Sequence, residues 1–251
     1  MIESLSTLIG PFHIKMLAVL LNATQWTVYL SLTAFIGGGL IGLIFTLLRI
    51  TPINWIRKLA VAYIWTFQSI PLLMLLFLTG LGIPIFYQIN VPPWVAATIS
   101  LTLFTSAYMS EVWRGALQSI NIGQWEAGRA LGLGFVNNLR YVIAPQALKI
   151  ATPPTVGFMV QVIKGTSLAY IIDFNDLMRW GKKIGNSQID GAEPFIVFPL
   201  VALIYFLLCF PLTLLSRRLE QSLNVGGKKL MLTINKGGSV SYTHLTLPTK
   251  A

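Results

Sequence analysis

The sequence predicts an all-α membrane protein of about five transmembrane helices, with the N-terminus outside and the C-terminus inside. Three observations indicate this fold class. Of the 251 residues, 55% are hydrophobic and 10% are charged, whereas a soluble domain usually carries about 25% charged residues. Apolar runs of roughly 20 residues recur, and each is long enough to cross a hydrocarbon core about 30 Å thick. The basic residues gather between these runs.

Residues 1–25 are expected to precede the first span. The apolar run 14–21 is too short to cross a bilayer, so we expect it to form an amphipathic lead-in on the outer, periplasmic face. Glu3 stands where a cleavable signal peptide would carry a basic residue. We therefore expect the N-terminal segment to remain in the mature protein.

Five runs within a predicted transmembrane domain, residues 26–220, are apolar enough to span the membrane. They are residues 26–48, 59–78, 94–113, 154–172 and 195–215. The first run contains four small residues that would let a neighbouring helix approach closely: Gly37, Gly38, Gly39 and Gly42. The fifth run contains Pro199 and Pro211, which a membrane helix tolerates if neighbouring groups satisfy the freed carbonyls.

The orientation is predicted from Lys and Arg, because basic loops stay on the cytoplasmic side. With five spans, one set of loops and ends holds most of these residues: Arg49, Arg57, Lys58, Arg114, Arg129, Arg140, Lys149, Arg217, Arg218, Lys228, Lys229 and Lys236. On the opposite side Lys15 stands alone at the start, and acidic residues offset the bases of loop 173–193. The first set is therefore expected to be cytoplasmic.

The cytoplasmic segment 114–153 is too polar to span the membrane but has helical patterning. Residues 125–131 suit a short helix, with Glu126 in the first turn and Arg129 toward its C-terminal end. Gly132 can end this helix in the left-handed conformation, at positive φ.

A second helix is expected after Gly132. An apolar stripe at helical spacing predicts it: Phe135, Leu139, Val142 and Ile143. Pro145 would end or kink the run. Physical reasoning alone leaves two roles equally open for this helix, turn and helix, namely an element lying in the membrane interface or a knob that docks into a partner.

The stretch EAGRALGLGFVNNLRYVIAP within this segment resembles the EAA loop of permease subunits in ATP-binding-cassette importers. That motif reads Glu-Ala-Ala, three residues, Gly, nine residues, then Ile-x-Leu-Pro. The matching residues are Glu126, Ala127, Gly132 and Pro145, with all spacings intact. The departures are Gly128 for the second alanine, Val142 for the isoleucine and Ala144 for the leucine.

Further stretches are similar to the polar amino-acid branch of these permeases, which imports histidine, glutamine, glutamate, arginine and opines. They are SAYMSEVWRGALQSINIGQWEAGRALGLG, YIWTFQSIPLLMLLF, APQALKIATPP and KGTSLAYII. The sequence departs from the branch at Gln68, Ser69 and Ile70, which usually read Arg-Gly-Thr. It departs again at Gly165, since an acid commonly follows the lysine there.

The resemblance implies the type I importer permease fold in a bacterial inner membrane. It implies that the EAA loop is a coupling helix that docks into a cytoplasmic ATPase dimer, with Glu126, Ala127, Arg129, Gly132 and Pro145 as its site residues. It also implies a second permease subunit, identical or different, and a periplasmic or lipid-anchored solute-binding protein. An import role for another small solute, such as methionine or an organic anion, is the alternative.

No enzymatic activity, cofactor or metal site is expected in this chain. No phosphate-binding pattern of Gly, four residues, Gly-Lys and Ser or Thr occurs, so ATP should be bound by the partner ATPase. The single Cys209 provides no thiolate cluster. An internal repeat typical of secondary transporters and a convergent catalytic set at membrane depth are both missing from the sequence. The basic residues are interpreted as a topology signal rather than as a nucleic-acid site.

Polar residues inside the predicted spans are candidates for the translocation path, because such residues usually face a bundle interior or an aqueous path. They are Gln68, Gln161 and Lys164. Glu111 is expected to pair with Arg114, three residues further along the same helix. Residues 221–251 form the predicted cytoplasmic tail, whose end, after about Gly237, resembles a vector-derived extension and is left out of the fold prediction.

Overall fold

The computed structural model describes residues 11–187 and 193–236, and these residues form helices and connecting turns. The predictions for residues 1–10 and for the tail after Gly237 lie outside this range. The α-helices are α2 (Pro11–Ile50), α3 (Asn54–Ser69), α4 (Leu72–Phe77), α5 (Ile83–Tyr87), α6 (Pro93–Gln118), α7 (Ile122–Ala130), α8 (Phe135–Asn138), α9 (Ala144–Thr166), α10 (Leu177–Gly185) and α11 (Pro194–Lys236). Wider π-helical turns occur at Leu78–Gly82 and Leu139–Ile143, and a 3-10 turn at Ser167–Ile172.

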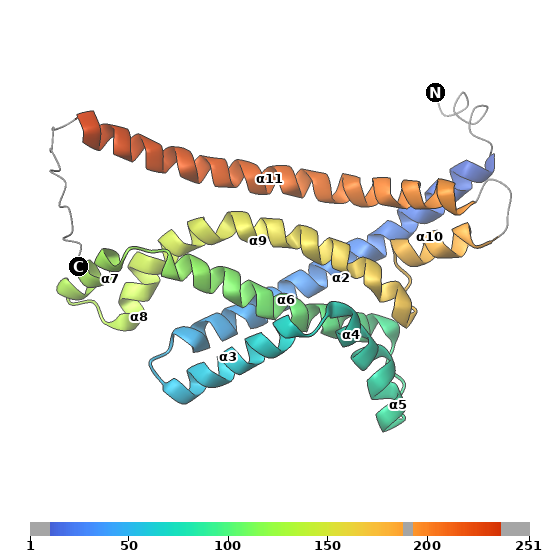
Figure 1. The fold of residues 1–251 in the computed structure, drawn as a ribbon, viewed down its shortest axis with the longest axis horizontal. Coiled ribbons are helices and arrows are strands. Elements are labelled where there is room, and N and C mark those ends of the chain that lie inside the picture. Colours follow the sequence, from blue (N-terminus) through green and yellow to red (C-terminus); the bar gives the residue numbers. More distant parts are fainter. Residues whose placement is uncertain (1–10, 188–192, 237–251) are drawn as a thin grey trace, which may run out of the picture.

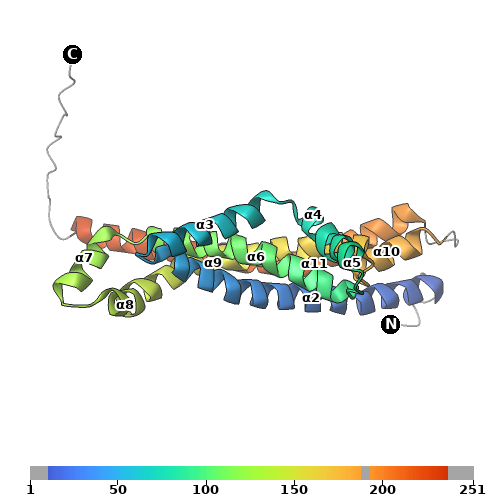
Figure 2. The ribbon, with the colours of Figure 1, turned by 90° about the horizontal axis from the view of Figure 1, so that it is seen from below.

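The long helices α2, α6, α9 and α11 lie lengthwise and form a flat, elongated bundle (Figures 1 and 2). Helices α7 and α8 lie at one end of this bundle, and α10 lies at the other, beside the start of α2 and of α11 (Figure 1). The molecule therefore has two distinct ends joined by long helices, as a membrane-spanning architecture requires.

Helix α6 occupies the middle of the bundle and packs against α2, α3 and α9. Its buried hydroxyl groups find partners within the protein. Ser100 Oγ lies 2.6 Å from Thr79 Oγ1 and donates to the Leu75 carbonyl at 3.1 Å, while Ser106 Oγ lies 2.7 Å from the Tyr63 hydroxyl. Because protein rather than lipid surrounds α6, its sequence tolerates more Ser and Thr than an outer helix would.

The predicted close approach at the glycines of the first span is confirmed. A Cβ atom added to Gly38 would lie 2.5 Å from Thr105 Cβ, and one added to Gly42 would lie 2.8 Å from the Ser106 carbonyl oxygen. Both contacts are with α6. Small residues therefore set the distance between α2 and α6.

The start of the first helix differs from the expectation of a separate lead-in. Helix α2 begins at Pro11 and continues for 40 residues without a break, which is about 60 Å at 1.5 Å per residue. Residues 14–21 are therefore its first turns. Met16 and Leu20 are buried against Leu177 of α10 and Val197 and Val201 of α11. These contacts explain why the apolar run continues the helix instead of ending it.

The second predicted span, residues 59–78, is wrong as a single helix. Helix α3 stops at Ser69, and the following segment Leu72–Tyr87 is bent from it by 96°. Pro71 supplies no backbone N–H, and it holds the preceding Ile70 in an extended conformation, with φ −85° and ψ 125°. Predicting a continuous span overlooked this restriction.

Three helical segments are long and apolar enough to cross a membrane: His13–Ile50, Phe135–Ile172 and Pro194–Leu223. The bent pair Asn54–Ser69 and Leu72–Tyr87 makes a fourth if it is one span. Helix α6 has 26 residues, enough in length, but it is less apolar and is not among these segments. The count of five spans therefore stays a prediction, with α6 as the candidate fifth.

Prolines inside the last span do not interrupt it, as predicted, because α11 continues through Pro199 and Pro211. Pro145 does not end the predicted run, because the helical segment Phe135–Ile172 continues through it. The prediction that Pro145 ends the run is therefore wrong, and a kink at this residue stays a prediction. Pro145 removes one backbone N–H from the segment just after the wider π-helical turn Leu139–Ile143.

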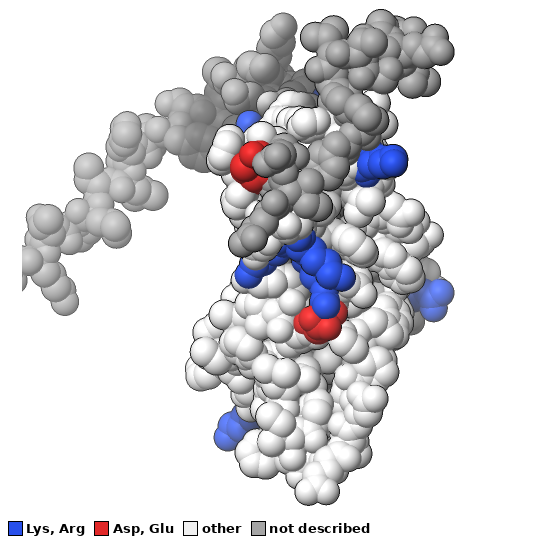
Figure 3. Space-filling model, turned by 90° about the vertical axis from the view of Figure 1, so that its right-hand side faces the viewer, with Lys and Arg blue, Asp and Glu red and all other residues white. Residues whose placement is uncertain are grey.

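The two ends differ in charge. Arg49, Arg57 and Arg114 lie at the end where α2 and α6 finish and α3 begins, which is also the end with α7 (Figure 1). On the visible part of the opposite end most atoms are uncharged, and basic and acidic atoms lie side by side near its middle (Figure 3). An ion pair between Arg179 and Asp173 lies in the segment between α9 and α10. The inside and outside assignment of these ends stays a prediction.

Candidate functional site

Helix α7 is the core of the predicted coupling loop. It begins one turn earlier than expected, at Ile122, because Asn121 caps it by accepting a hydrogen bond from the Gly123 backbone N–H at 2.8 Å. Glu126 therefore lies in the second turn rather than the first. Arg129 lies in the last turn, as predicted, where a cation is favoured by the helix dipole.

The turn that ends α7 has the predicted left-handed glycine. Gly132 has φ 77°, its N–H donates to the Arg129 carbonyl at 2.9 Å, and the next N–H, of Leu133, donates to the Gly128 carbonyl at 3.1 Å. These two bonds form a Schellman motif, which satisfies carbonyls at the end of the helix. The direction in which the chain leaves α7 is thus determined by backbone hydrogen bonds.

One face of α7 is held by Asn138, a residue that sequence reasoning did not single out. Its side chain is 1% exposed, and its Nδ2 donates to the Trp125 carbonyl at 2.9 Å. A Cβ atom added to Gly128 would lie 2.6 Å from Asn138 Nδ2 and closer still to the other amide atoms. Gly128, a departure from the EAA pattern, leaves the space that the Asn138 side chain occupies.

The apolar stripe predicted after Gly132 packs beneath α7. Ile143 is fully buried in a cluster with Ile120 and Ala147, and Leu139, Val142 and Trp125 pack against this cluster. Phe135 is half-exposed and stacks on Trp125 with ring centroids 6.0 Å apart. The apolar stripe therefore packs against α7 through Trp125.

The other face of α7 is uncovered in the described part of the chain. Glu126, Ala127, Arg129 and Ala130 are exposed. Leu131 is 81% exposed and Ile122 68% exposed. Exposed apolar side chains beside a Glu and an Arg make a surface suited to a protein partner. Pro145 is also exposed, at the start of α9.

The structure separates the three candidates for the translocation path into two places. Gln68 is half-buried near the end of α3, and its Nε2 lies 3.4 Å from the Ala107 carbonyl of α6. Gln161 and Lys164 are both exposed and lie three residues apart on α9, so they share one side of that helix. Lys164 also lines a groove of about 690 Å³ between α9 and α11.

The predicted pairing of Glu111 with Arg114 is confirmed, and a third member joins it. Arg114 Nη2 lies 2.6 Å from Glu111 Oε2, and Arg49 at the end of α2 forms an ion pair with the other carboxylate oxygen. Arg49 was recognised only as a topology signal, because no local spacing connects it to residue 111. This network joins the ends of α2 and α6 next to α7.

Asp176 is a buried acid that the sequence did not mark. It caps α10 by accepting a hydrogen bond from the Arg179 backbone N–H at 2.8 Å, and its side chain is inaccessible to solvent. Burial raises the pKa of Asp176 to about 7, although the backbone bond from Arg179 acts in the opposite direction. The Asp-x-x-Arg spacing before an amphipathic stretch could have indicated this cap.

Comparisons with known proteins are consistent with this geometry. Residues 38–225 match the family described as "Binding-protein-dependent transport system inner membrane component". A Bacillus subtilis protein named "Probable glutamine ABC transporter permease protein GlnP" is 34% identical over 84% of this chain and 97% of its own length. The B. subtilis "L-cystine transport system permease protein TcyB" is 32% identical over 82% of this chain and 87% of its own.

Solved structures give the same result. A chain in the "Crystal structure of an amino acid ABC transporter with histidines" superposes with a TM-score of 0.78 at 28% identity, covering 84% of this chain and 96% of that chain. A chain of the MetNI methionine transporter has a TM-score of 0.68 at 20% identity, covering 82% of this chain and 98% of that chain; this likeness shows the fold alone, so methionine is not favoured. The type I importer permease fold is thereby confirmed, and the chain belongs to the family of binding-protein-dependent transport system inner membrane components.

Proposed function

We propose that this chain is the membrane-spanning permease subunit of an ATP-driven importer of a polar amino acid in a bacterial inner membrane. The observation that carries the proposal is the geometry of α7. This helix is anchored on one face by Asn138 and the Schellman turn and is uncovered on the other, where Glu126 and Leu131 are exposed. A rigidly attached helix with one free apolar and charged face can transmit the movement of a partner to the bundle.

The partner proposed for α7 is a cytoplasmic ATPase dimer that binds and hydrolyses ATP. The chain itself has no phosphate-cradling Gly-rich loop, so no cofactor is assigned to it. Glu126, Ala127 and Arg129 would contact the ATPase, while Gly132 and Pro145 would set the path of the chain on either side of the contact. Closure of the ATPase dimer would then pull on α7 and reorient the long helices.

A second permease subunit is proposed from the exposed side of α9. Gln161 and Lys164 are exposed within a helix long and apolar enough to span the membrane. A lysine at membrane depth is expensive by about 2.5–3.5 kcal/mol if lipid surrounds it. A second subunit, identical or different, would cover this face and leave a polar path between the two. Gln68 would belong to the same path if, in the assembly of the two subunits, it lies beside Gln161 and Lys164.

The substrate class is proposed from the relatives, whose printed names include glutamine and cystine transport. A solute-binding protein on the outer face would deliver the amino acid. The role of the path residues is then to let a zwitterion pass, since amide and ammonium groups can replace part of its hydration shell.

The test is reconstitution of the chain with its ATPase and binding protein in sealed vesicles. Glutamine, cystine, histidine, arginine and methionine are offered separately with ATP. We expect uptake of one or more of the polar amino acids, loss of uptake with Lys164→Leu, and preserved uptake with Lys149→Leu, a control at the other end of α9. ATP hydrolysis by the purified chain alone, or uptake of methionine and none of the others, would contradict the proposal.

A further inference from the structure

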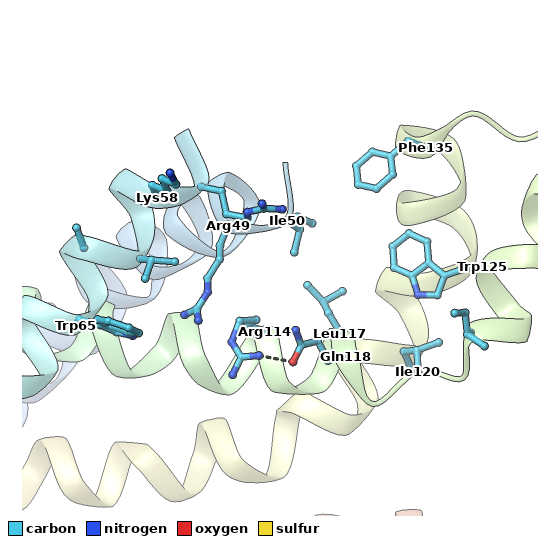
Figure 4. A pocket seen from close by; sticks show the side chains of 14 residues that line it. Arg49, Ile50, Lys58, Trp65, Arg114, Leu117, Gln118, Ile120, Trp125 and Phe135 are labelled. Atoms are coloured by element: carbon cyan, nitrogen blue, oxygen red, sulfur yellow. Dashed lines mark hydrogen bonds between the residues drawn. The ribbon is translucent and has the colours of Figure 1, made fainter. Parts of the chain in front are cut away.

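A basic pocket of about 900 Å³ lies where α2 ends, α3 begins and α6 ends, and α7 closes one side of it. Figure 4 shows Arg49, Lys58 and Arg114 on one side of the pocket and Trp125 and Phe135 on the other. The fourth cation lining the pocket is Arg57. The proposed transport role assigns no function to the four cations of this pocket.

The cations of the pocket exceed the acids. Glu111 is shared by Arg49 and Arg114. Arg57 donates a hydrogen bond to the neutral Asn54 Oδ1 at 2.8 Å, and Lys58 is exposed. Within the described ranges, neither Arg57 nor Lys58 has a carboxylate at ion-pair distance. Four cations and one shared carboxylate leave the pocket positively charged, so it favours an anion.

The walls of the pocket beyond these cations are apolar. Val61 and Trp65 continue along α3 from Lys58, and Leu117 and Ile120 face them from α6 and the turn after it. Trp65 lies seven residues beyond Lys58, or about 10 Å along the helix. Leu59 and Trp65 are 62% and 65% exposed. A cationic entrance followed by an apolar wall matches an amphiphile with an anionic head.

We propose that this pocket binds the phosphate of an anionic membrane phospholipid, with Arg57 and Lys58 on the headgroup and an acyl chain along α3 toward Trp65. Basic pockets between helix ends on the cytoplasmic side are suited to such headgroups. Free phosphate shares the chemistry of the head but would leave the apolar wall unused. An acidic loop of a protein partner would likewise not need a wall that extends toward the apolar part of α3.

The bound lipid would connect two elements that the chain itself leaves apart. The pocket is lined by Lys58 and Trp65 of α3 on one side and by Trp125 and Phe135 of the coupling segment on the other. A headgroup between them would stabilise one position of α7 relative to the bundle. Lipid composition would therefore influence how firmly the coupling helix is held.

The binding experiment uses the full chain reconstituted in nanodiscs of phosphatidylcholine with 30% phosphatidylglycerol as the probe composition, followed by mild detergent extraction and native mass spectrometry. The pocket variant is Arg57→Gln with Lys58→Gln. The matched control is Arg217→Gln with Arg218→Gln, an exposed neighbouring pair on α11 that does not line the pocket. Monodisperse elution of both variants shows that each one is folded.

We expect wild type and the control to retain phosphatidylglycerol and the pocket variant to retain it at least tenfold more weakly, since the variant removes two bases that attract an anionic headgroup. Arg57→Lys with Lys58→Arg should retain it. Trp65→Ala should weaken retention of the lipid without changing the binding of inorganic phosphate.

Four results would overturn the proposal. Equal losses in the pocket and control variants would indicate general attraction to an anionic surface, and equal retention of phosphatidylcholine would remove the role of the headgroup. If millimolar inorganic phosphate displaced the bound phosphatidylglycerol as strongly as added phosphatidylglycerol does, the occupant of the pocket would be a free anion. Because retention is measured on the chain alone, failure of the transport proposal would not alter these results. If, instead, the pocket variant loses the ATPase while keeping phosphatidylglycerol, the pocket is a protein-docking surface and the lipid assignment is wrong.

Discussion

Helices α7 and α10 lie at opposite ends of the bundle and are alike in size and in their start. Each has nine residues, and each is capped by the side chain of an Asn or Asp that accepts a backbone N–H bond. Their burial differs. Helix α10 packs against both α2 and α11 and buries Asp176 and Leu177 completely. Helix α7 buries only Gly128 and contacts the segment that follows it in sequence.

This difference separates a helix that holds the bundle together from a helix whose outer face is uncovered in the described part of the chain and is proposed to meet a partner. A residue on α10 is expected to affect folding, because α10 contacts α2, which is far away in the chain, as well as α11, which follows it. A residue on α7 is expected to affect coupling, because its contacts are local and its outer face is free. Substitutions on the two helices should therefore give different combinations of stability and uptake.

The largest expected effect is on α10. Leu177→Ala should lower the stability of the protein in detergent by about 2–5 kcal/mol, because it leaves a cavity among Met16, Leu20 and Val197. The matched substitution on α7, Leu131→Ala, removes the same atoms from a side chain that is 81% exposed, and it should change stability by less than about 0.5 kcal/mol. Thermal unfolding of both variants is the measurement. Similar losses would remove the distinction between the helices.

The second expected effect is a pH dependence on α10, on the order of a few kcal/mol. The pKa of Asp176 is about 7 in the folded protein and near its ordinary value of about 4 when unfolded. Folding therefore favours the protonated acid, and its stabilising contribution is present below pH 4 and is lost as the pH rises through about 7. The neighbouring polar groups are the Arg179 guanidinium and the Tyr205 hydroxyl.

Asp176→Asn should abolish this loss, because the amide stays neutral and its oxygen can still accept the Arg179 N–H. Wild type should unfold at a lower temperature at pH 8 than at pH 5, and the variant should show a smaller difference. A control, Asp173→Asn, changes the exposed acid that pairs with Arg179. An unchanged pH profile in Asp176→Asn would show that this acid is not the titrating group.

The third effect tests the contact that anchors α7. Gly128→Ala should place a methyl group on the Asn138 amide, destabilise the loop by about 1–3 kcal/mol and reduce uptake. Adding Asn138→Ala removes the amide, so the double variant should recover part of the uptake lost by Gly128→Ala. Gly115→Ala is the control, because nothing lies within 4 Å of a Cβ at that position. Equal uptake by the single and double variants would show that the two residues do not interact.

The smallest effect on stability is expected at the end of α7. Gly132→Val forces a β-branched residue to φ 77°, at a cost of about 1–2 kcal/mol or more. Because this strain changes the direction in which the chain leaves α7, the helix proposed to couple to the ATPase, uptake should fall while membrane abundance stays normal. Gly134→Val is the control, since Gly134 has φ −63° and open space around it. Normal uptake and intact ATPase docking in Gly132→Val would remove this turn from the mechanism, and low abundance alone would make Gly132 only a structural stop.

Local features were predictable wherever the responsible atoms are close together in sequence. The positive φ of Gly132, the Glu111–Arg114 pair and the apolar stripe of Leu139, Val142 and Ile143 all follow from spacings of a few residues. The break at Pro71 was also local, and recognising the restriction on the residue before proline would have divided the second span correctly. The continuity of α2 was not local, because it depends on α10 and α11 covering Met16 and Leu20.

Two departures from the family pattern show the same limit. Gly128 is explained only by Asn138, ten residues away, and a Cβ at Gly165 would lie 3.0 Å from Leu72 and 3.5 Å from Leu101. A side chain at the Gly165 position would therefore require the Leu72 side chain to shift, while Leu101 would lie in ordinary van der Waals contact. Neither reason is visible in the sequence, because the neighbours belong to other elements.

The sequence by itself determined that lipid is the solvent of this chain, that its basic loops gather at one end, and that the first helix of segment 114–153 ends at a left-handed glycine. Composition, charge and backbone preference are properties of short stretches, so each of these is already present before folding. The tertiary structure alone decided which glycines leave space that a side chain of another element fills, that Arg49 pairs with Glu111, that Asp176 is buried, and that four cations line one pocket. These features depend on the distances between helices, and packing of the whole bundle sets those distances.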